Sequence, residues 1–261
     1  MSDSTLRQTL KRFVPEPALL ALRRLRRRLN RLPSHAVYRQ ALADKSGLEV
    51  GGPSPLFRDV LPVYPVVAAL DGVNFSTSTM WEGEITAGGR FEFDRGRSGR
   101  QFIAEATQLE GIESGRYQFL LSSNCLEHVA NPLKALREWM RVLEPGGVFL
   151  LVLPNPQANF DHRRPVTRFE HLLDDDIQGV GEDDLTHLDE VLTLHDLDRD
   201  PWAGGRENFT RRSRDNLVHR GLHHHIFDAA LIAQMTAHVG LVPIRQDSSA
   251  SDFFYLGRSP S

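Results

Sequence analysis

The clearest pattern of apolar and polar residues lies in the stretch 117–156. The apolar run 119–121 ends at small polar residues, which is typical of a buried parallel strand that opens onto a site. Asn131 and Pro132 predict a helix start, because asparagine caps a first turn well and proline is tolerated at the first helical position. Apolar residues then recur at helical spacing at Leu133, Leu136, Met140 and Leu143.

The predicted helix ends at the proline–glycine–glycine turn 145–147, and a second strand follows it. Residues 148–153 are all apolar, which is typical of a central strand covered on both faces. Strand, helix, turn and strand make a βαβ unit, whose crossover is right-handed. Ligands of open sheets bind beyond the carboxyl ends of the strands, so we expect a binding crevice at residues 122–128 and 154–156.

Shorter apolar runs predict the other strands of an α/β fold. The first strand ends at Val50 and the second ends at Asp71, and a loop or small hairpin is expected over 76–100. Asp228 is expected to cap a helix that ends near Gly240. The remaining strands are expected at 102–104, 241–246 and 252–257, of which the last two close the sheet.

A family resemblance rests on the segment SSNCLEHVANPLKALREWMRVLEPGGVFLLVLPNP, residues 122–156. It resembles the second half of a class I S-adenosylmethionine-dependent methyltransferase, of the bacterial type 11-like group with the pattern LEH…P…L.E..RVL.PGG. The resemblance implies a Rossmann-like, seven-stranded, mostly parallel sheet with an antiparallel last strand. It also implies S-adenosylmethionine as the cofactor and methyl transfer as the reaction.

The same resemblance implies an acid–glycine turn that wraps the amino-acid end of the cofactor. Glu49, Gly51 and Gly52 supply the acid and the first glycine, and Pro53 stands where the family has its second glycine. Asp71 is expected to hold the ribose hydroxyls, since an acid about 20 residues after such a turn has this role in dinucleotide-type folds. A plain Asp-Gly turn is the alternative.

The ends of the third and fourth strands complete the expected cofactor site. Glu105, followed by Ala106, is expected to accept a hydrogen bond from the adenine amino group, and an exposed strand-end acid is the alternative. Further cofactor contacts are expected at Ser122, Ser123, Asn124 and His128.

No metal is expected at the start of the following helix. Some methyltransferases bind a divalent metal through a similar Glu-x-x-Glu-His start, but Asn124 replaces the first acid here. Glu127 is instead expected in a first helical turn, where the macrodipole favours an acid. A metal at Glu127 and His128 is the alternative.

Three adjacent histidines, 223–225, supply candidates for proton transfer. On an extended chain His223 and His225 share one face. An imidazole suits proton removal near neutral pH, so His223, His225 and His187 are the candidate catalytic residues. A packed or surface cluster, and a metal site shared with His187, are the open alternatives.

Composition and charge limit the classes of partner. One cysteine among 261 residues excludes an intrachain disulfide framework, and no apolar run approaches the ~18 residues of a membrane span. Residues 1–33 hold nine basic and two acidic residues, a net charge of +7, so the rest carries −10 of the total of −3. The acidic body argues against a nucleic-acid substrate.

The basic N-terminal helices leave several partners open. Contact with an anionic membrane, packing on the acidic body, a homodimer contact and a solvated helix are the alternatives for 1–33. A cytoplasmic location is expected by default, and a peripheral position at the inner membrane surface is the alternative.

The chain is divided into an N-terminal extension 1–45, a core 46–156, a lid 157–222 and a C-terminal part 223–261. The lid is expected to carry short helices over the acceptor site.

The leading functional hypothesis is O-methylation of a polar acceptor, such as a sugar hydroxyl of a saccharide or lipid-linked glycan. A hydroxyl must lose its proton, which requires a base such as histidine. The segments GLEVGGPS, DGVNF and HHHIFD are similar to bacterial methyltransferases linked with cell-surface polysaccharide synthesis.

Two other functions are kept open. Methylation of a small natural product or phenol predicts an apolar crevice lined from 157–222, whereas a sugar predicts polar groups and aromatic stacking. A non-catalytic scaffold is the second alternative, and it is suggested by Pro53 and Glu105, which depart from the family pattern.

Overall fold

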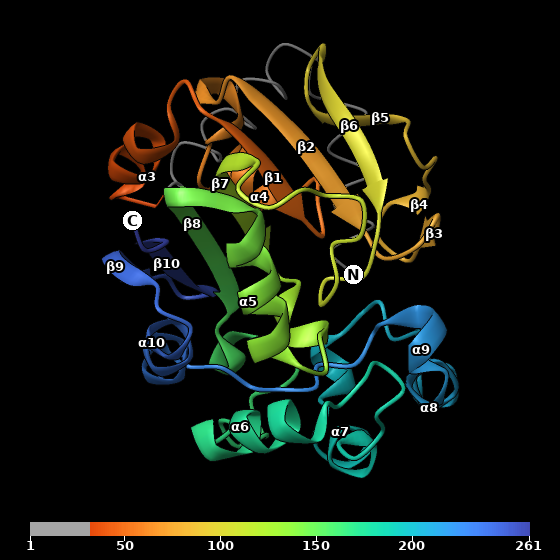
Figure 1. Cartoon of the computed structure of the whole chain (residues 1–261). Helices are drawn as coiled ribbons and strands as arrows, with labels where there is room; N and C mark the ends of the chain where they lie inside the picture. Colours follow the sequence, from red (N-terminus) through yellow and green to blue (C-terminus); the bar gives the residue numbers. More distant parts are fainter. Residues whose placement is uncertain (1–31) are drawn as a thin grey trace, which may run out of the picture.

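Eight strands form one sheet in the computed structural model, which describes residues 32–261 (Figure 1). Its strand order is β5-β6-β2-β1-β7-β8-β10-β9. In chain order these strands are β1 (Ser46–Val50), β2 (Ala69–Asn74), β5 (Arg90–Asp94), β6 (Arg97–Ile103), β7 (Tyr117–Ser123), β8 (Leu143–Pro154), β9 (Val242–Ser248) and β10 (Asp252–Arg258).

The strand directions confirm the predicted Rossmann-like α/β class. The five central strands, from β6 to β8, pair in parallel, and β10 runs antiparallel to both β8 and β9. β5 is an eighth strand beyond the seven expected, and it pairs antiparallel with β6 as a hairpin. A separate small hairpin joins β3 (Ser78–Thr79) to β4 (Gly83–Glu84). The region 76–100 therefore contains two hairpins.

The helices cover both faces of the sheet and one of its ends. They are α3 (His35–Leu42), α4 (Pro55–Asp59), α5 (Pro132–Val142), α6 (Phe169–Gln178), α7 (Leu188–Leu194), α8 (Arg206–Arg214), α9 (Asn216–His219) and α10 (Ala229–His238). Single 3₁₀ turns occur at Tyr64–Val66, Leu126–His128, Pro156–Ala158 and Leu197–Arg199.

Alternate residues of the central strands face two separate apolar layers. Leu120 of β7 packs with α5 and α10, whereas Phe119 and Leu121 pack with α3 and α4. Residues 148–153 of β8 are buried throughout, as predicted for a strand covered on both faces. This double cover fixes the carboxyl ends of the strands as one rigid edge.

The two helices predicted from their caps begin where expected. The Asn131 side chain accepts a hydrogen bond from Lys134 N at 2.9 Å at the start of α5. Asp228 does the same for Leu231 N at 2.8 Å at the start of α10. Each cap satisfies an amide that lacks a partner within the helix.

The expected end of the second strand is wrong. β2 runs to Asn74, three residues beyond Asp71, because Tyr64–Val66 forms a 3₁₀ turn and the strand starts only at Ala69. Asp71 is tolerated inside the strand because its carboxylate accepts hydrogen bonds from Tyr117 Oη and Arg100 N, both at 2.8 Å.

The segment 157–222 carries α6 to α9, which lie at the end of the molecule toward which the parallel strands run (Figure 1). Among them, α6 packs against α5 and α10. This arrangement agrees with short helices over one end of the sheet, while the division of the chain into four parts stays a prediction. None of the helices within residues 32–261 is long and apolar enough to cross a membrane. The expected basic helices of 1–33 lie almost wholly outside the described residues.

Candidate functional site

A cavity of about 670 Å³ lies at the carboxyl ends of the central strands. Its walls come from the ends of β1, β2, β6, β7 and β8 on one side and from the segment 157–222 on the other. A cavity of this size suits a small-molecule cofactor or substrate. The sequence-predicted residues that line it are Gly51, Pro53, Glu105, Ala106, Ser123, Asn124, His128 and His223.

The turn after β1 requires glycine at two positions. Gly51 has φ +78°, and a Cβ there would lie 2.7 Å from Cys125 Sγ. A Cβ on Gly52 would lie 2.3 Å from the carboxyl carbon of Glu49. The backbone therefore turns directly over a buried acid and approaches the cavity without side chains in between.

Glu49 lies beneath this turn and does not line the cavity. Its carboxylate accepts hydrogen bonds from Ser54 N at 2.9 Å and from Tyr64 Oη at 2.9–3.0 Å. Complete burial raises the pKa of Glu49 to about 7, although these hydrogen bonds oppose the shift. Glu49 thus fixes the turn and leaves a titratable charge directly behind it.

Asn74, not Asp71, is the polar residue at the end of β2. Its Nδ2 donates to Gly52 O at 3.0 Å, and the residue lines the cavity beside Phe75. Asp71 lies within the strand and is absent from the cavity wall. The buried apolar residue Val73, two positions after Asp71, is the sequence signal that could have extended this strand.

Glu105 lines the cavity, but its carboxylate is paired with a residue of the segment 157–222. Arg220 donates to it at 2.8 and 3.2 Å, and a second nitrogen–oxygen contact of 2.9 Å joins Arg220 to Glu182. The guanidinium also lies 5.0 Å from the ring centre of Phe75. Nothing local in the sequence indicated this pairing, which joins residues 115 positions apart.

The end of β7 contributes two of its three expected residues. Ser123 and Asn124 line the cavity, whereas Ser122 is buried within the strand and its Oγ donates to Val50 O at 3.3 Å. Within residues 32–261, the buried Ser123 Oγ has no hydrogen-bond partner. A buried polar atom without a hydrogen-bond partner on a cavity wall is available to form a hydrogen bond with a bound ligand.

His223 lines the cavity with a carboxylate behind it. Its Nδ1 lies 2.5 Å from Asp161 Oδ2, and Arg164 Nη1 contacts the other oxygen of the same carboxylate at 3.3 Å. Desolvation lowers the pKa of His223, but Asp161 outweighs it, with help from Glu127, and the pKa is raised. Asp161 is buried, yet His223 and Arg164 hold its pKa down at about 2.

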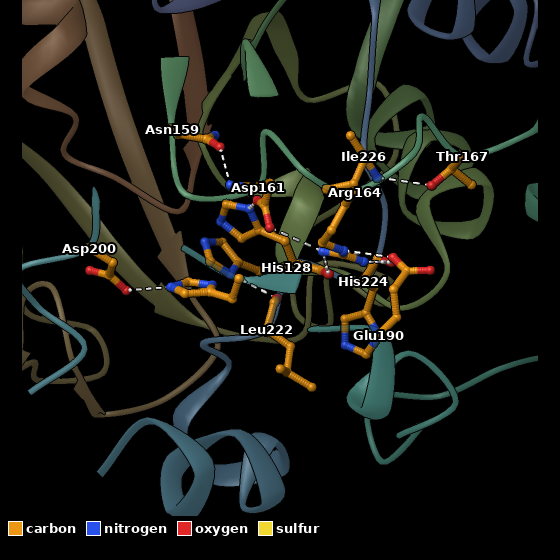
Figure 2. A network of polar contacts seen from close by, with 12 residues as sticks. His128, Asn159, Asp161, Arg164, Thr167, Glu190, Asp200, Leu222, His224 and Ile226 are labelled. Atoms are coloured by element: carbon orange, nitrogen blue, oxygen red, sulfur yellow. Dashed lines mark hydrogen bonds and ion pairs between the residues drawn. The ribbon is translucent and has the colours of Figure 1, made fainter. Parts of the chain in front are cut away.

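Arg164 lies at the centre of the contacts drawn in Figure 2. Besides Asp161 it reaches Glu190 at 2.7 Å and the backbone oxygens of His223 and His224 at 2.8 and 3.3 Å. These contacts join the segment 157–222 to the segment that carries the histidines. No sequence pattern connected Asp161 to His223, because 62 positions separate them.

His128 stands next to His223 under an aromatic cover. Their ring centres lie 4.6 Å apart, and the rings of Trp81 and Phe160 approach the pair at 5.1 and 5.0 Å. His128 Nδ1 donates to the backbone oxygen of Leu222 at 3.1 Å. Burial, reinforced by His223, lowers the pKa of His128 well below its usual value, so the ring is neutral.

The structure does not bring His187 and His225 to the cavity. His225 is fully buried with Nε2 3.0 Å from Ala130 O, and His187 contacts His171. The expectation that His223 and His225 share a face is wrong, because residues 220–228 form irregular backbone instead of a strand. Of the three candidate catalytic histidines, only His223 lines the cavity.

The segment 157–222 contributes polar and aromatic side chains to the cavity wall. Trp81, from the small hairpin region, and Trp202 stand at this wall with 53% and 86% of their surfaces exposed. The residues that 157–222 contributes are Asn159, Phe160, Glu182, Asp200, Trp202, Arg212, Arg220 and Gly221.

A family model matches most of this chain. Residues 20–246 match the sequence model of a family described as a methyltransferase domain. No curated protein matches the sequence.

Solved structures are similar at low sequence identity. A SAM-dependent methyltransferase from Aquifex aeolicus is 11% identical over 88% of this chain and 92% of its own, with a TM-score of 0.48. The 4+2 cyclase SpnF is 13% identical over 90% and 80%, with a TM-score of 0.49. The 1,6-didemethyltoxoflavin-N1-methyltransferase of Burkholderia thailandensis, solved with S-adenosylhomocysteine, is 12% identical over 88% and 77%, with a TM-score of 0.46.

Proposed function

The chain belongs to the methyltransferase-domain family, and on this premise we propose that it methylates a hydroxyl oxygen of a polar acceptor such as a sugar. S-adenosylmethionine is the cofactor, and when bound it supplies a methyl group activated by a sulfonium. The protein must therefore position the acceptor, remove its proton and exclude water.

The residues at the strand ends fit this cofactor. Gly51 and Pro53 present backbone to the cavity, and Asn74 stands at the end of β2 where a ribose is expected in such folds. The partnerless Ser123 Oγ faces a volume that suits a small-molecule cofactor. Gly51, Pro53, Asn74, Ser123 and Asn124 would hold the cofactor.

Glu105 keeps its expected role toward adenine as part of the proposal. Its side chain is 40% exposed, but both oxygens accept hydrogen bonds from Arg220. A carboxylate has lone pairs for further donors, so Arg220 and an adenine amino group can share it. Arg220 would then close the adenine end of the cavity from the lid.

His223 is the residue best placed to act as general base. If Nδ1–H donates to Asp161, the tautomer is fixed and Nε2 carries the lone pair that accepts the acceptor's proton. The ionised Asp161 then stabilises the imidazolium that forms. Arg164 holds Asp161 in place and also contacts the His223 backbone, so it positions both partners.

The side chains that 157–222 contributes to the cavity wall support the proposal of a polar acceptor. The eight residues that 157–222 places there include five polar or charged side chains and two aromatic ones, and none is aliphatic. Exposed tryptophans such as Trp81 and Trp202 offer flat apolar faces beside polar groups, which suits stacking on a sugar ring. A small phenolic acceptor would favour an apolar wall.

The proposal is tested by methyl transfer from labelled cofactor to a panel of saccharides and phenols. We expect transfer to a saccharide hydroxyl in the wild type and in His219→Ala, an exposed histidine outside the cavity. We expect none in His223→Ala. Transfer to phenols alone would refute the proposed acceptor class. Full activity in His223→Ala would refute the role of His223 as the base.

A further inference from the structure

A second cluster of histidines lies outside the cavity. His171 and Asp175 are one helical turn apart on α6, His187 directly precedes α7, and His225 belongs to the segment before α10. Each of the four residues offers a nitrogen or oxygen atom, and these atoms all lie within 4.8 Å of one another. Three separate chain segments therefore bring metal-ligand side chains to one point.

The spacing inside the cluster resembles the edges of a small coordination polyhedron. His171 Nε2 lies 3.0 Å from His187 Nε2 and 3.4 Å from Asp175 Oδ2. A tetrahedral ion with ligand bonds of about 2.0–2.2 Å has edges of roughly 3.3–3.6 Å. Binding would draw the ligand atoms, which all lie within 4.8 Å of one another, toward that geometry.

Two polar atoms of the cluster lack a hydrogen-bond partner within residues 32–261. Asp175 Oδ2 is buried without a hydrogen bond, and its side chain is only 10% exposed. His225 is fully buried, and its Nε2 donates to Ala130 O at 3.0 Å, which leaves the lone pair on Nδ1 without a hydrogen-bond partner. Buried polar atoms without partners are costly, and a bound cation would satisfy them.

We propose that His171, Asp175, His187 and His225 bind one divalent metal ion of the zinc type. Three imidazoles and one carboxylate favour zinc, cobalt or nickel over magnesium or calcium, which prefer oxygen ligands. An opening of about 460 Å³, lined by His171, His187 and Glu190, gives an ion access to the site.

This metal ion has a structural role. None of its four ligands lines the cofactor cavity, so it does not touch the reacting atoms. It joins α6, α7 and the segment of His225, and that segment carries His223 two residues earlier. The ion would therefore fasten the lid helices to the backbone that presents the proposed base.

Another group of ligand residues provides the competing explanation for any metal binding. Glu127, His128 and His223 also lie within 4.8 Å of one another, but they line the cavity. Variants that remove ligands from each group separately distinguish the two sites. Metal binding can be measured without the methyl-transfer reaction, so its result does not depend on the proposed function.

The test is calorimetric titration of tag-free, chelator-treated full-length protein with Zn²⁺, repeated with Co²⁺ and read by visible absorption. We expect one ion per chain and a tetrahedral Co²⁺ spectrum. We expect Tm to rise by about 5–10 °C when free Zn²⁺ is 100 times Kd. His171→Ala and His187→Ala should each raise Kd by at least about 10- to 100-fold.

His219→Ala on α9 is the matched control, since His219 is as exposed as His171 and belongs to neither group. It should bind as the wild type does. Circular dichroism and the metal-free Tm show that each variant is folded. Absence of binding, binding that survives both His171→Ala and His187→Ala, or binding that is lost only in His223→Ala, overturns the proposal.

Discussion

At the scale of single residues, the proposed chemistry depends on one carboxylate held against one histidine. Asp161→Asn removes the charge that stabilises the His223 imidazolium and disturbs its tautomer. We expect kcat to fall by about 10²–10⁴-fold, as when a general base is lost, with the cofactor Kd unchanged within about threefold. Steady-state kinetics and calorimetry measure the two quantities.

The matched comparison for Asp161→Asn is His223→Ala. Because the two residues act as a unit, the double variant should be no slower than the slower single variant. Additive losses, or a kcat for Asp161→Asn within about twofold of the wild type, would contradict the paired role.

We expect Glu49 to make cofactor binding depend on pH. Its pKa is raised to about 7, so its negative charge is largely absent below that pH and present above it. S-adenosylmethionine is cationic, and its affinity should therefore rise as pH increases through 7. Glu49→Gln should flatten this rise while keeping an acceptor for Tyr64 and Ser54. Calorimetry from pH 5.5 to 8.5 checks this, and an identical slope in both proteins would contradict it.

Single residues also show where the sequence was insufficient. Gly51 and Ser123 were expected at the site from the family resemblance and His223 from its residue type, and all three line the cavity. Asn74 was missed because the start of β2 depends on a 3₁₀ turn that shifts the strand by three residues. Asp161 and Arg220 were missed because their partners are distant in sequence.

At the scale of elements, the turn between β1 and α4 is the most constrained part of the site. Gly51→Ala introduces a Cβ 2.7 Å from Cys125 Sγ at a positive φ. We expect the free energy of unfolding to fall by about 1–3 kcal/mol and cofactor Kd to rise at least tenfold. Denaturant melts and calorimetry measure both.

Gly111→Ala is a control for backbone strain alone. Gly111 has φ +76°, and nothing lies within 4 Å of a Cβ built there. Because Gly111→Ala adds only backbone strain, its free energy of unfolding should fall by about 1 kcal/mol, and it should bind the cofactor as the wild type does. If Gly51→Ala and Gly111→Ala lost cofactor affinity equally, the turn after β1 would have no direct role in cofactor binding.

Elements with local signals were predicted best. α5 and α10 were located by their capping side chains and apolar spacing, and β8 by its continuous apolar run. Of the β5–β6 hairpin only the end of β6 was predicted as part of the main sheet, because the two strands otherwise alternate exposed and buried residues among many charges. Irregular backbone at 220–228 likewise has no sequence period.

At the scale of the whole molecule, the sheet edge and the lid form one site from distant segments. Arg220 joins the lid to Glu105, and Arg164 joins it to the backbone of His223. The fold class followed from the order of strands and helices. The contacts of Arg164 and Arg220 could not be predicted, since their partners lie 59 and 115 positions away in the sequence.

The most direct test of the central claim is calorimetric titration with S-adenosylhomocysteine of the wild type, Gly51→Asp and His223→Ala. We predict one site per chain in the wild type, loss of binding in Gly51→Asp and retained binding in His223→Ala. Absence of binding to the wild type at millimolar ligand would contradict the account and would favour a scaffold that has lost its cofactor.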